Sequence, residues 1–287
     1  MDKYNEAISK YEKNLNDEII KNEVENLLKN NISKNCNAEV YKTIFSCLDI
    51  TTLDVTDNYE SVLKLVEMIN NLDNEQPDIP NVAAICVYPN FITAVRGALE
   101  VSEVNVASVS GGFPSSQTYP EVKVIEAGLA LKDGADELDI VMNVGNFIIG
   151  NYEDMCDEIN EVKEICGDAK LKVILETGAL KSYNNVRKAA ILSIYAGADF
   201  IKTSTGKIAV GATPEAFYTM CNAIKDYYEE TGTKIGIKAA GGIRTAADAA
   251  KYYTIVKEVL GEEWLNKDLF RIGAASLADN LISAINE

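Results

Sequence analysis

Eight short runs rich in β-branched and apolar residues recur along the chain, and longer helical patterns separate them. The runs are 43–50, 81–88, 104–110, 136–143, 171–177, 198–204, 234–240 and 269–275. Strands that alternate with helices are typical of parallel sheets in α/β proteins, and eight such units predict a (β/α)₈ TIM barrel. A doubly wound open sheet is the alternative, but its glycine fingerprint is missing after the first run.

The first 40 residues differ from the rest of the chain. They are polar and rich in lysine and glutamate, so we expect an N-terminal helical extension over residues 1–40 and a catalytic barrel domain over 41–287. The N-terminus has no apolar run typical of a signal peptide, and no stretch is long enough to span a membrane. We therefore expect a cytoplasmic protein.

Composition excludes several classes of function. The net charge is −17, which disfavours nucleic acids and anionic membranes as partners. The chain has no histidine, and its six cysteines form no CxxC pair. Catalysis by His-activated nucleophiles and ordinary zinc sites are thereby excluded, and the chemistry must rely on lysines, carboxylates, hydroxyls and backbone amides.

The predicted strands carry charged residues on one face. Because side chains alternate along a strand, Lys202 shares a face with Phe200 and Ser204. The same alternation places a polar set inside the barrel, namely Asp49, Asp139, Lys172, Glu176, Lys202 and Lys238. Salt bridges that merely fill the barrel would explain any one of these residues, but they stabilise little compared with apolar packing.

Two of these residues suggest covalent chemistry. Lys202 and Lys238 lie one βα unit apart, on neighbouring strands, near the end of the barrel where such enzymes keep their sites. Two like charges on neighbouring strands, together with partial desolvation, lower the pKa of one of the two amines. A neutral lysine can attack a carbonyl to form an imine. Asp139 and Lys238 are the candidates for the accompanying acid–base steps.

Small glycine-rich loops follow the last three predicted strands, at 203–207, 240–245 and 273–276. Loops after the last strands of a barrel often bind phosphate through backbone N–H groups and helix N-termini. Lys207 and Arg244 can add positive charge there, and Ser276 can donate a hydrogen bond. The three loops together predict a phosphorylated substrate.

The chain resembles the deoxyribose-phosphate aldolases, class I aldolases that form a Schiff base on a (β/α)₈ barrel. The resemblance covers residues 42–285 and rests on "LDITTL", "NVAAICVYP", "DELDIV", "LKVILETG", "FIKTSTGK", "GIKAAGGIRT" and "RIGAASL". It implies reversible cleavage of 2-deoxy-D-ribose 5-phosphate into D-glyceraldehyde 3-phosphate and acetaldehyde. It implies no metal or organic cofactor, and a possible homodimer.

The resemblance also implies roles for particular residues. Lys202 matches the imine-forming lysine, Lys238 the second active-site lysine and Asp139 the acid–base aspartate. The positions that match phosphate-binding residues are Gly206, Lys207, Gly241, Gly242 and Ser276, and those that match residues near the sugar are Asp49, Thr51 and Cys86. Ala275 stands where the family often has a second serine, so one donor is lost.

Two other functions remain open on the sequence. A different Schiff-base enzyme, such as a transaldolase-like or other sugar-phosphate aldolase, would use the same lysine with another donor. A sugar-phosphate sensor without turnover would keep the pocket, although binding alone needs no nucleophilic lysine.

Overall fold

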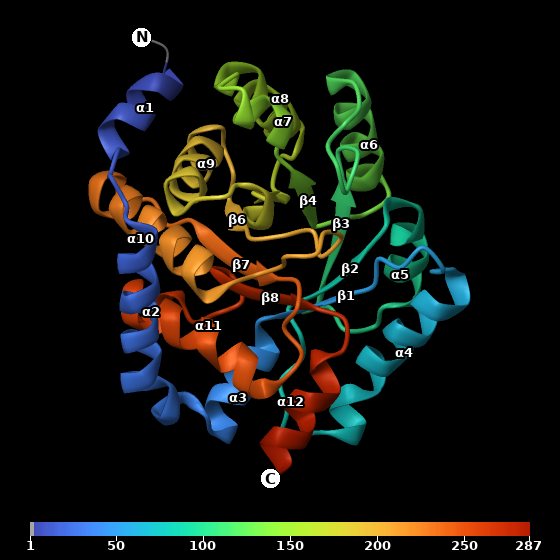
Figure 1. Cartoon of the computed structure of the whole chain (residues 1–287). Coiled ribbons are helices and arrows are strands. Elements are labelled where there is room, and N and C mark those ends of the chain that lie inside the picture. The colour runs from blue at the N-terminus through green and yellow to red at the C-terminus, as the bar shows by residue number, and fades with distance from the viewer. Residues whose placement is uncertain (1–2) are drawn as a thin grey trace.

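A computed structural model of the chain describes residues 3–287, apart from the side chain of Asp73. Eight parallel strands close into a barrel in sequence order (Figure 1). They are β1 (Leu48–Thr51), β2 (Ala84–Val87), β3 (Asn105–Ser110), β4 (Glu137–Val141), β5 (Lys170–Ile174), β6 (Phe200–Lys202), β7 (Gly236–Ala240) and β8 (Phe270–Ala274). The predicted (β/α)₈ barrel is therefore confirmed, and the open sheet is excluded.

Helices surround the barrel. They are α4 (Tyr59–Glu75), α5 (Ile92–Ala98), α6 (Pro120–Lys132), α7 (Val144–Ile148), α8 (Tyr152–Ile165), α9 (Tyr183–Tyr195), α10 (Pro214–Thr231), α11 (Ala246–Val259) and α12 (Leu277–Asn286). Short 3₁₀ turns are η2 (Pro89–Phe91), η3 (Thr177–Ala179) and η4 (Glu262–Trp264). Local chemistry starts these helices: the Thr213 side chain accepts a hydrogen bond from the Ala216 N–H, and Pro214 occupies the first turn of α10.

The first predicted strand was assigned too early in the chain. Helix α3 (Ala38–Ser46) occupies the whole of its first half, and β1 begins only at Leu48. The Asn37 side chain caps α3 by accepting from the Val40 N–H, and Val40, Ile44 and Phe45 form its buried face. The spacing of these three residues is helical, and it prevailed over their β propensity.

The N-terminal extension is helical, as predicted. It consists of α1 (Lys3–Tyr11), α2 (Asp17–Asn31) and η1 (Ile32–Asn35). These elements pack on the outer side of the helical ring, with α1 against α8 and α9 and α2 against α10 and α11 (Figure 1). The division of the chain at residue 40 stays a prediction. No helix in residues 3–287 has the length and apolarity needed to cross a bilayer.

Strand register brings the two key lysines together. Lys202 of β6 and Lys238 of β7 are direct neighbours in the sheet, as are Phe200 and Gly236. A Cβ atom at position 236 would lie 2.3 Å from the Phe200 ring. Glycine at this position therefore makes room for the ring that fills the barrel interior below the lysines.

We predict that Gly236→Ala lowers the free energy of unfolding by about 1–3 kcal/mol, because the Phe200 ring and its neighbours must shift. Gly97→Ala is the matched control, since no atom lies within 4 Å of the Cβ it would add in α5. Urea unfolding should show a loss for the first variant and none for the second. Equal stability of Gly236→Ala and the unmodified protein would contradict the prediction.

Candidate active site

Seven charged side chains fill the interior of the barrel. They come from six strands, every one is at most 2% exposed, and they are Asp49, Glu137, Asp139, Lys172, Lys202, Lys238 and Arg271. We refer to these residues as the barrel cluster. Their positions confirm the prediction from alternation that Asp49, Asp139, Lys172, Lys202 and Lys238 point inward.

Asp139 lies at the centre of the barrel cluster. Its Oδ1 accepts from Lys172 Nζ at 2.8 Å. Its Oδ2 accepts from Lys202 Nζ at 2.7 Å and from Lys238 Nζ at 2.8 Å. The carboxylate thus joins the two predicted active-site amines through a single oxygen.

A second layer of contacts anchors the cluster from β1 and β8. Asp49 Oδ2 lies 2.5 Å from Lys238 Nζ, and Asp49 Oδ1 accepts from Arg271 Nη1 at 2.6 Å. Glu137 Oε1 accepts from Arg271 Nη2 at 2.7 Å, and Glu137 Oε2 also pairs with Lys172. Arg271 therefore links Asp49 to Glu137.

The cluster contains four basic side chains but only three carboxylates. Lys172, Lys238 and Arg271 each lie within ion-pair distance of at least two of these carboxylates. Among the described residues, Lys202 has one such partner, Asp139. A buried charge without full compensation is costly, so Lys202 is the group that loses its proton most readily.

The pKa directions agree with this count. Burial lowers the pKa of Lys202; Asp139 opposes this effect and the Lys238 charge adds to it, leaving the pKa below its ordinary value. Burial also lowers the pKa of Lys238, but Asp139 and Asp49 outweigh it and raise that pKa above its ordinary value. We expected repulsion between the lysines to dominate at Lys202, whereas burial is the largest cause in the structure.

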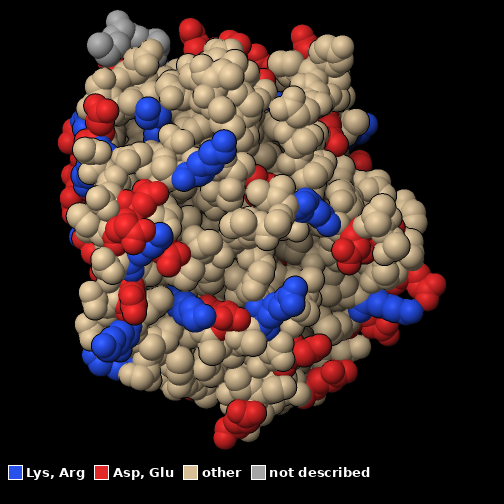
Figure 2. Space-filling view, viewed as in Figure 1, with Lys and Arg blue, Asp and Glu red and all other residues tan. Residues whose placement is uncertain are grey.

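A cavity of about 390 Å³ opens above Lys202 at the barrel mouth. Eight residues predicted for the site line it, namely Thr51, Lys202, Gly206, Lys207, Gly241, Gly242, Arg244 and Ser276. Although the protein is strongly acidic, Lys and Arg side chains lie around the hollowed centre of the face in Figure 2, and most Asp and Glu side chains lie towards its edge. The cavity can therefore hold an anion against the overall charge.

Backbone geometry shapes the wall of this cavity. Gly241 has φ +92°, which favours glycine, and a Cβ at this position would lie 3.0 Å from the Gly211 Cα. Ser276 begins α12 without a capping hydrogen bond from its side chain, which leaves the hydroxyl available. The Lys207 ammonium donates to the Leu53 carbonyl across the cavity.

Two predicted substrate contacts lie deeper than expected. Asp49 and Cys86 are fully buried and are not among the residues that line the cavity. Asp49 contacts Lys238 and Arg271, whereas Cys86 packs with Leu53 in the upper barrel. Their contact with substrate stays a prediction.

Glu176 does not join the barrel cluster, contrary to expectation. The strand ends at Ile174, and Glu176 has a left-handed backbone with φ 54°. Its carboxylate accepts from the Thr205 N–H at 3.2 Å and from Thr205 Oγ1 at 2.5 Å. It therefore supports the loop that carries Gly206 and Lys207.

Sequence reasoning missed Arg271 and Glu137 as partners in the cluster. Alternation along β8 was the available signal, since Phe270 and Ile272 pack in the apolar core and Arg271 and Gly273 take the other face. A Cβ at Gly273 would lie 2.8 Å from Lys238 Cε, so glycine leaves the space that this lysine occupies.

The barrel cluster is organised around amines and a guanidinium. In the part of the chain that the structure describes, no three Cys, Asp or Glu side chains are arranged to hold a metal ion. What the arrangement offers is one amine of lowered pKa at the floor of a cavity, with a carboxylate and a second ammonium beside it. These are the groups that imine formation with a carbonyl compound requires.

Comparison with known proteins decides the family. Residues 45–277 match the model of the DeoC/LacD family aldolases. The chain belongs to this aldolase family. It is 42% identical over 245 residues to deoxyribose-phosphate aldolase of Mus musculus, with 82% of this chain and 77% of the mouse protein covered. The human deoxyribose-phosphate aldolase is 41% identical over 245 residues, with the same shares covered.

Solved structures of aldolases agree with this assignment. A tetrameric deoxyribose phosphate aldolase from Aeropyrum pernix aligns with a TM-score of 0.69 and 27% identity, covering 91% of this chain and 97% of that one. The aldolase QR15 aligns with a TM-score of 0.68 and 30% identity, over 84% of this chain and 96% of its own. This aldolase thus shares its fold with both of these solved aldolases.

The charge count predicts opposite effects of removing the two lysines. Lys202→Met should raise the free energy of unfolding at pH 7 by about 1 kcal/mol or more, because it removes the least compensated amine. Lys238→Met should lower it by about 3 kcal/mol, because Asp49 and Asp139 each lose a close ammonium partner in the buried interior. Urea unfolding of both variants measures these changes.

The pH dependence provides a check. Because the pKa of Lys202 is lower in the folded protein, the unfolded chain binds more protons, and this residue makes stability rise with pH up to ~10.4. That contribution should be absent in Lys202→Met. A similar loss of stability in both variants would refute the assignment of the deficit to Lys202.

Proposed function

We propose that this aldolase reversibly cleaves 2-deoxy-D-ribose 5-phosphate into D-glyceraldehyde 3-phosphate and acetaldehyde. The observation that carries the proposal is the buried Lys202 amine, whose pKa is lowered, at the floor of a cavity. Glycine-rich loops and basic side chains, groups suited to binding phosphate, line this cavity. The names of the mouse and human relatives support the choice of substrate.

The reaction begins with a covalent bond to Lys202. Its neutral Nζ attacks the C1 aldehyde carbon of the open-chain sugar, and loss of water, with one proton supplied by a neighbouring acid, gives a protonated imine. A base then removes the proton of the C3 hydroxyl, the C2–C3 bond breaks, and its electron pair passes through C2 to the imine nitrogen. D-glyceraldehyde 3-phosphate leaves, and an enamine remains on Lys202.

Asp139 and Lys238 supply the acid–base steps. Protonation of the enamine carbon and hydrolysis of the imine release acetaldehyde and restore the amine. Asp139 Oδ2 contacts both Lys202 and Lys238, so a proton can pass between the lysines through one oxygen. Lys238 stays protonated because its pKa is raised, and its charge helps to keep Lys202 neutral.

The phosphate of the substrate occupies the glycine-rich side of the cavity. Backbone N–H groups of Gly206, Gly241 and Gly242 can donate to it, together with the Ser276 hydroxyl at the start of α12. Lys207 and Arg244 provide the positive charge. Thr51 contacts the sugar from the opposite wall, whereas Asp49 acts by positioning Lys238 and Cys86 by packing beneath the sugar.

We also propose a cytoplasmic homodimer. All six cysteines are free, as expected in a reducing compartment, and five of them are buried. One outer face of α6 and its start exposes an apolar row, Tyr119, Val122, Ile125 and Leu129, next to Ile165 of α8. An apolar face of this kind is typical of an interface between subunits.

Borohydride trapping tests the covalent step. With acetaldehyde or 2-deoxyribose 5-phosphate present, reduction should fix one adduct on Lys202, and Lys202→Met should give none. Peptide mass mapping locates the adduct. An adduct on another lysine would overturn the mechanism, and trapping and turnover with ketose phosphates alone would favour a different Schiff-base aldolase. Trapping without turnover would favour the sensor.

Lys207→Met tests the phosphate site. We expect its KM for 2-deoxyribose 5-phosphate to rise about tenfold or more, because a charge-assisted contact to the phosphate is lost. Turnover of unphosphorylated 2-deoxyribose should change little. Lys170→Met, at the exposed start of β5, is the control and should leave both substrates unaffected. An equal loss with both substrates in Lys207→Met would contradict a role in phosphate binding.

A further inference from the structure

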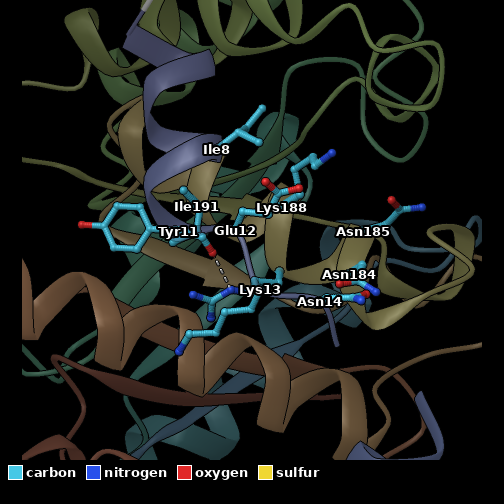
Figure 3. Close-up of a pocket in the computed structure, with 10 residues that line it drawn as sticks. Ile8, Tyr11, Glu12, Lys13, Asn14, Asn184, Asn185, Lys188 and Ile191 are labelled. Carbon is cyan, nitrogen blue, oxygen red and sulfur yellow. Dashed lines mark hydrogen bonds between the residues drawn. The ribbon is translucent and has the colours of Figure 1, made fainter. Parts of the chain in front are cut away.

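A second cavity, of about 420 Å³, lies between the N-terminal extension and α9 (Figure 3). It shares no lining residue with the cavity at the barrel mouth. In Figure 3, Asn14, Asn184 and Asn185 lie together at the right of the view, and Tyr11 lies at the left. The proposed aldolase mechanism gives this second cavity no role.

Hydrogen bonds hold the walls of this cavity in place. The Asn184 amide is paired with the backbone of Leu15, donating to its carbonyl at 2.8 Å and accepting from its N–H at 2.9 Å. Arg187 Nε donates to the Tyr11 carbonyl at 3.0 Å. The segment that follows α1 is therefore fixed to the first turns of α9, and the cavity between them is built rather than a chance gap.

The buried charge in this wall is positive. Arg187 is only 4% exposed, and its Nη2 donates to Asp226 at 2.5 Å. Lys13 Nζ uses the same Asp226 oxygen, also at 2.5 Å, so two cations share one carboxylate. Arg187 lines the cavity, and no hydrogen bond to an acceptor among residues 3–287 uses its Nη1, so this N–H is available to a ligand there.

Two more charges line the opening. Lys188 lies 5.4 Å from the centre of the Tyr152 ring and forms no ion pair with a described carboxylate. Glu12 lines the same cavity and brings one negative charge. Together with Lys13, Arg187 and Asp226, the site carries a net charge of about +1 in a protein of net charge −17. The apolar side chains Ile8 and Ile191 complete the lining.

We propose that this cavity binds a small organic anion, a phosphate ester or a carboxylate with a compact apolar body. Arg187 Nη1 and Lys188 would bind the anionic group, since a guanidinium N–H and an ammonium are suited to phosphate or carboxylate oxygens. Ile8 and Ile191 would contact the apolar body. Because the ligand would touch both α1 and α9, it would hold the N-terminal extension against the barrel.

Phenyl phosphate and benzoate are suitable probes, and benzyl alcohol is the neutral control. Calorimetric titration of the full-length protein should detect binding of at least one anion and no comparable binding of the alcohol. Lys188→Met should weaken the binding about fivefold or more, and Glu12→Gln should strengthen it, because the first removes an attraction and the second a repulsion. The anion that binds more tightly shows whether the cavity prefers a phosphate ester or a carboxylate.

Two further measurements separate this site from the barrel mouth. Lys207→Met should leave anion binding unchanged at this site, and Lys188→Met should leave aldolase turnover unchanged. Bound anion should slow amide hydrogen exchange over residues 3–15, where only the second cavity lies. Binding that disappears in Lys207→Met but survives in Lys188→Met, equal binding of benzyl alcohol, or no binding at ~10 mM of either anion would overturn the proposal.

Discussion

Asp139 accepts hydrogen bonds from three buried lysines, and the properties of the site follow from how this carboxylate and two others divide their charge. Three carboxylates compensate the charges of Lys172, Lys238 and Arg271. Lys202 pairs with one carboxylate, Asp139, which it shares with Lys172 and Lys238. In a buried site such a deficit lowers the pKa of the least compensated amine. Whether Lys202 is neutral therefore depends on the numbers of basic and acidic groups in the whole barrel cluster. Burial strengthens the effect of these charges on the Lys202 pKa.

Several unfavourable features of the interior have the same origin. An apolar core would be more stable than seven buried charges, and the barrel accommodates them by close fitting. Gly236 leaves room for Phe200 and Gly273 leaves room for Lys238, so two strands lack side chains where the cluster needs volume. The interior beside Lys202 is therefore less stable than an apolar core would be, as is common at catalytic sites.

The sequence predicted the barrel and the inward direction of Lys202, Lys238 and Asp139, because strand alternation has a fixed period of two. It did not predict which groups pair, since Arg271 and Glu137 meet across the barrel from β8 and β4, far apart in the chain. The end of the helix over Ala38–Ser46, residues 43–46, was assigned to a strand because these residues have β propensity. The depth of Asp49 and the left-handed turn at Glu176 depend on tertiary contacts that alternation does not encode.

The most direct test is the pH dependence of imine trapping on Lys202 in two variants that leave Lys202, Lys238 and Asp139 intact. Arg271→Met equalises the basic groups and carboxylates, and the midpoint of trapping should move to higher pH by about one pH unit or more. The double variant Arg271→Met/Glu137→Gln restores the deficit, and its midpoint should return towards that of the unmodified enzyme. If the midpoint is the same in all three proteins, the charge count does not control Lys202.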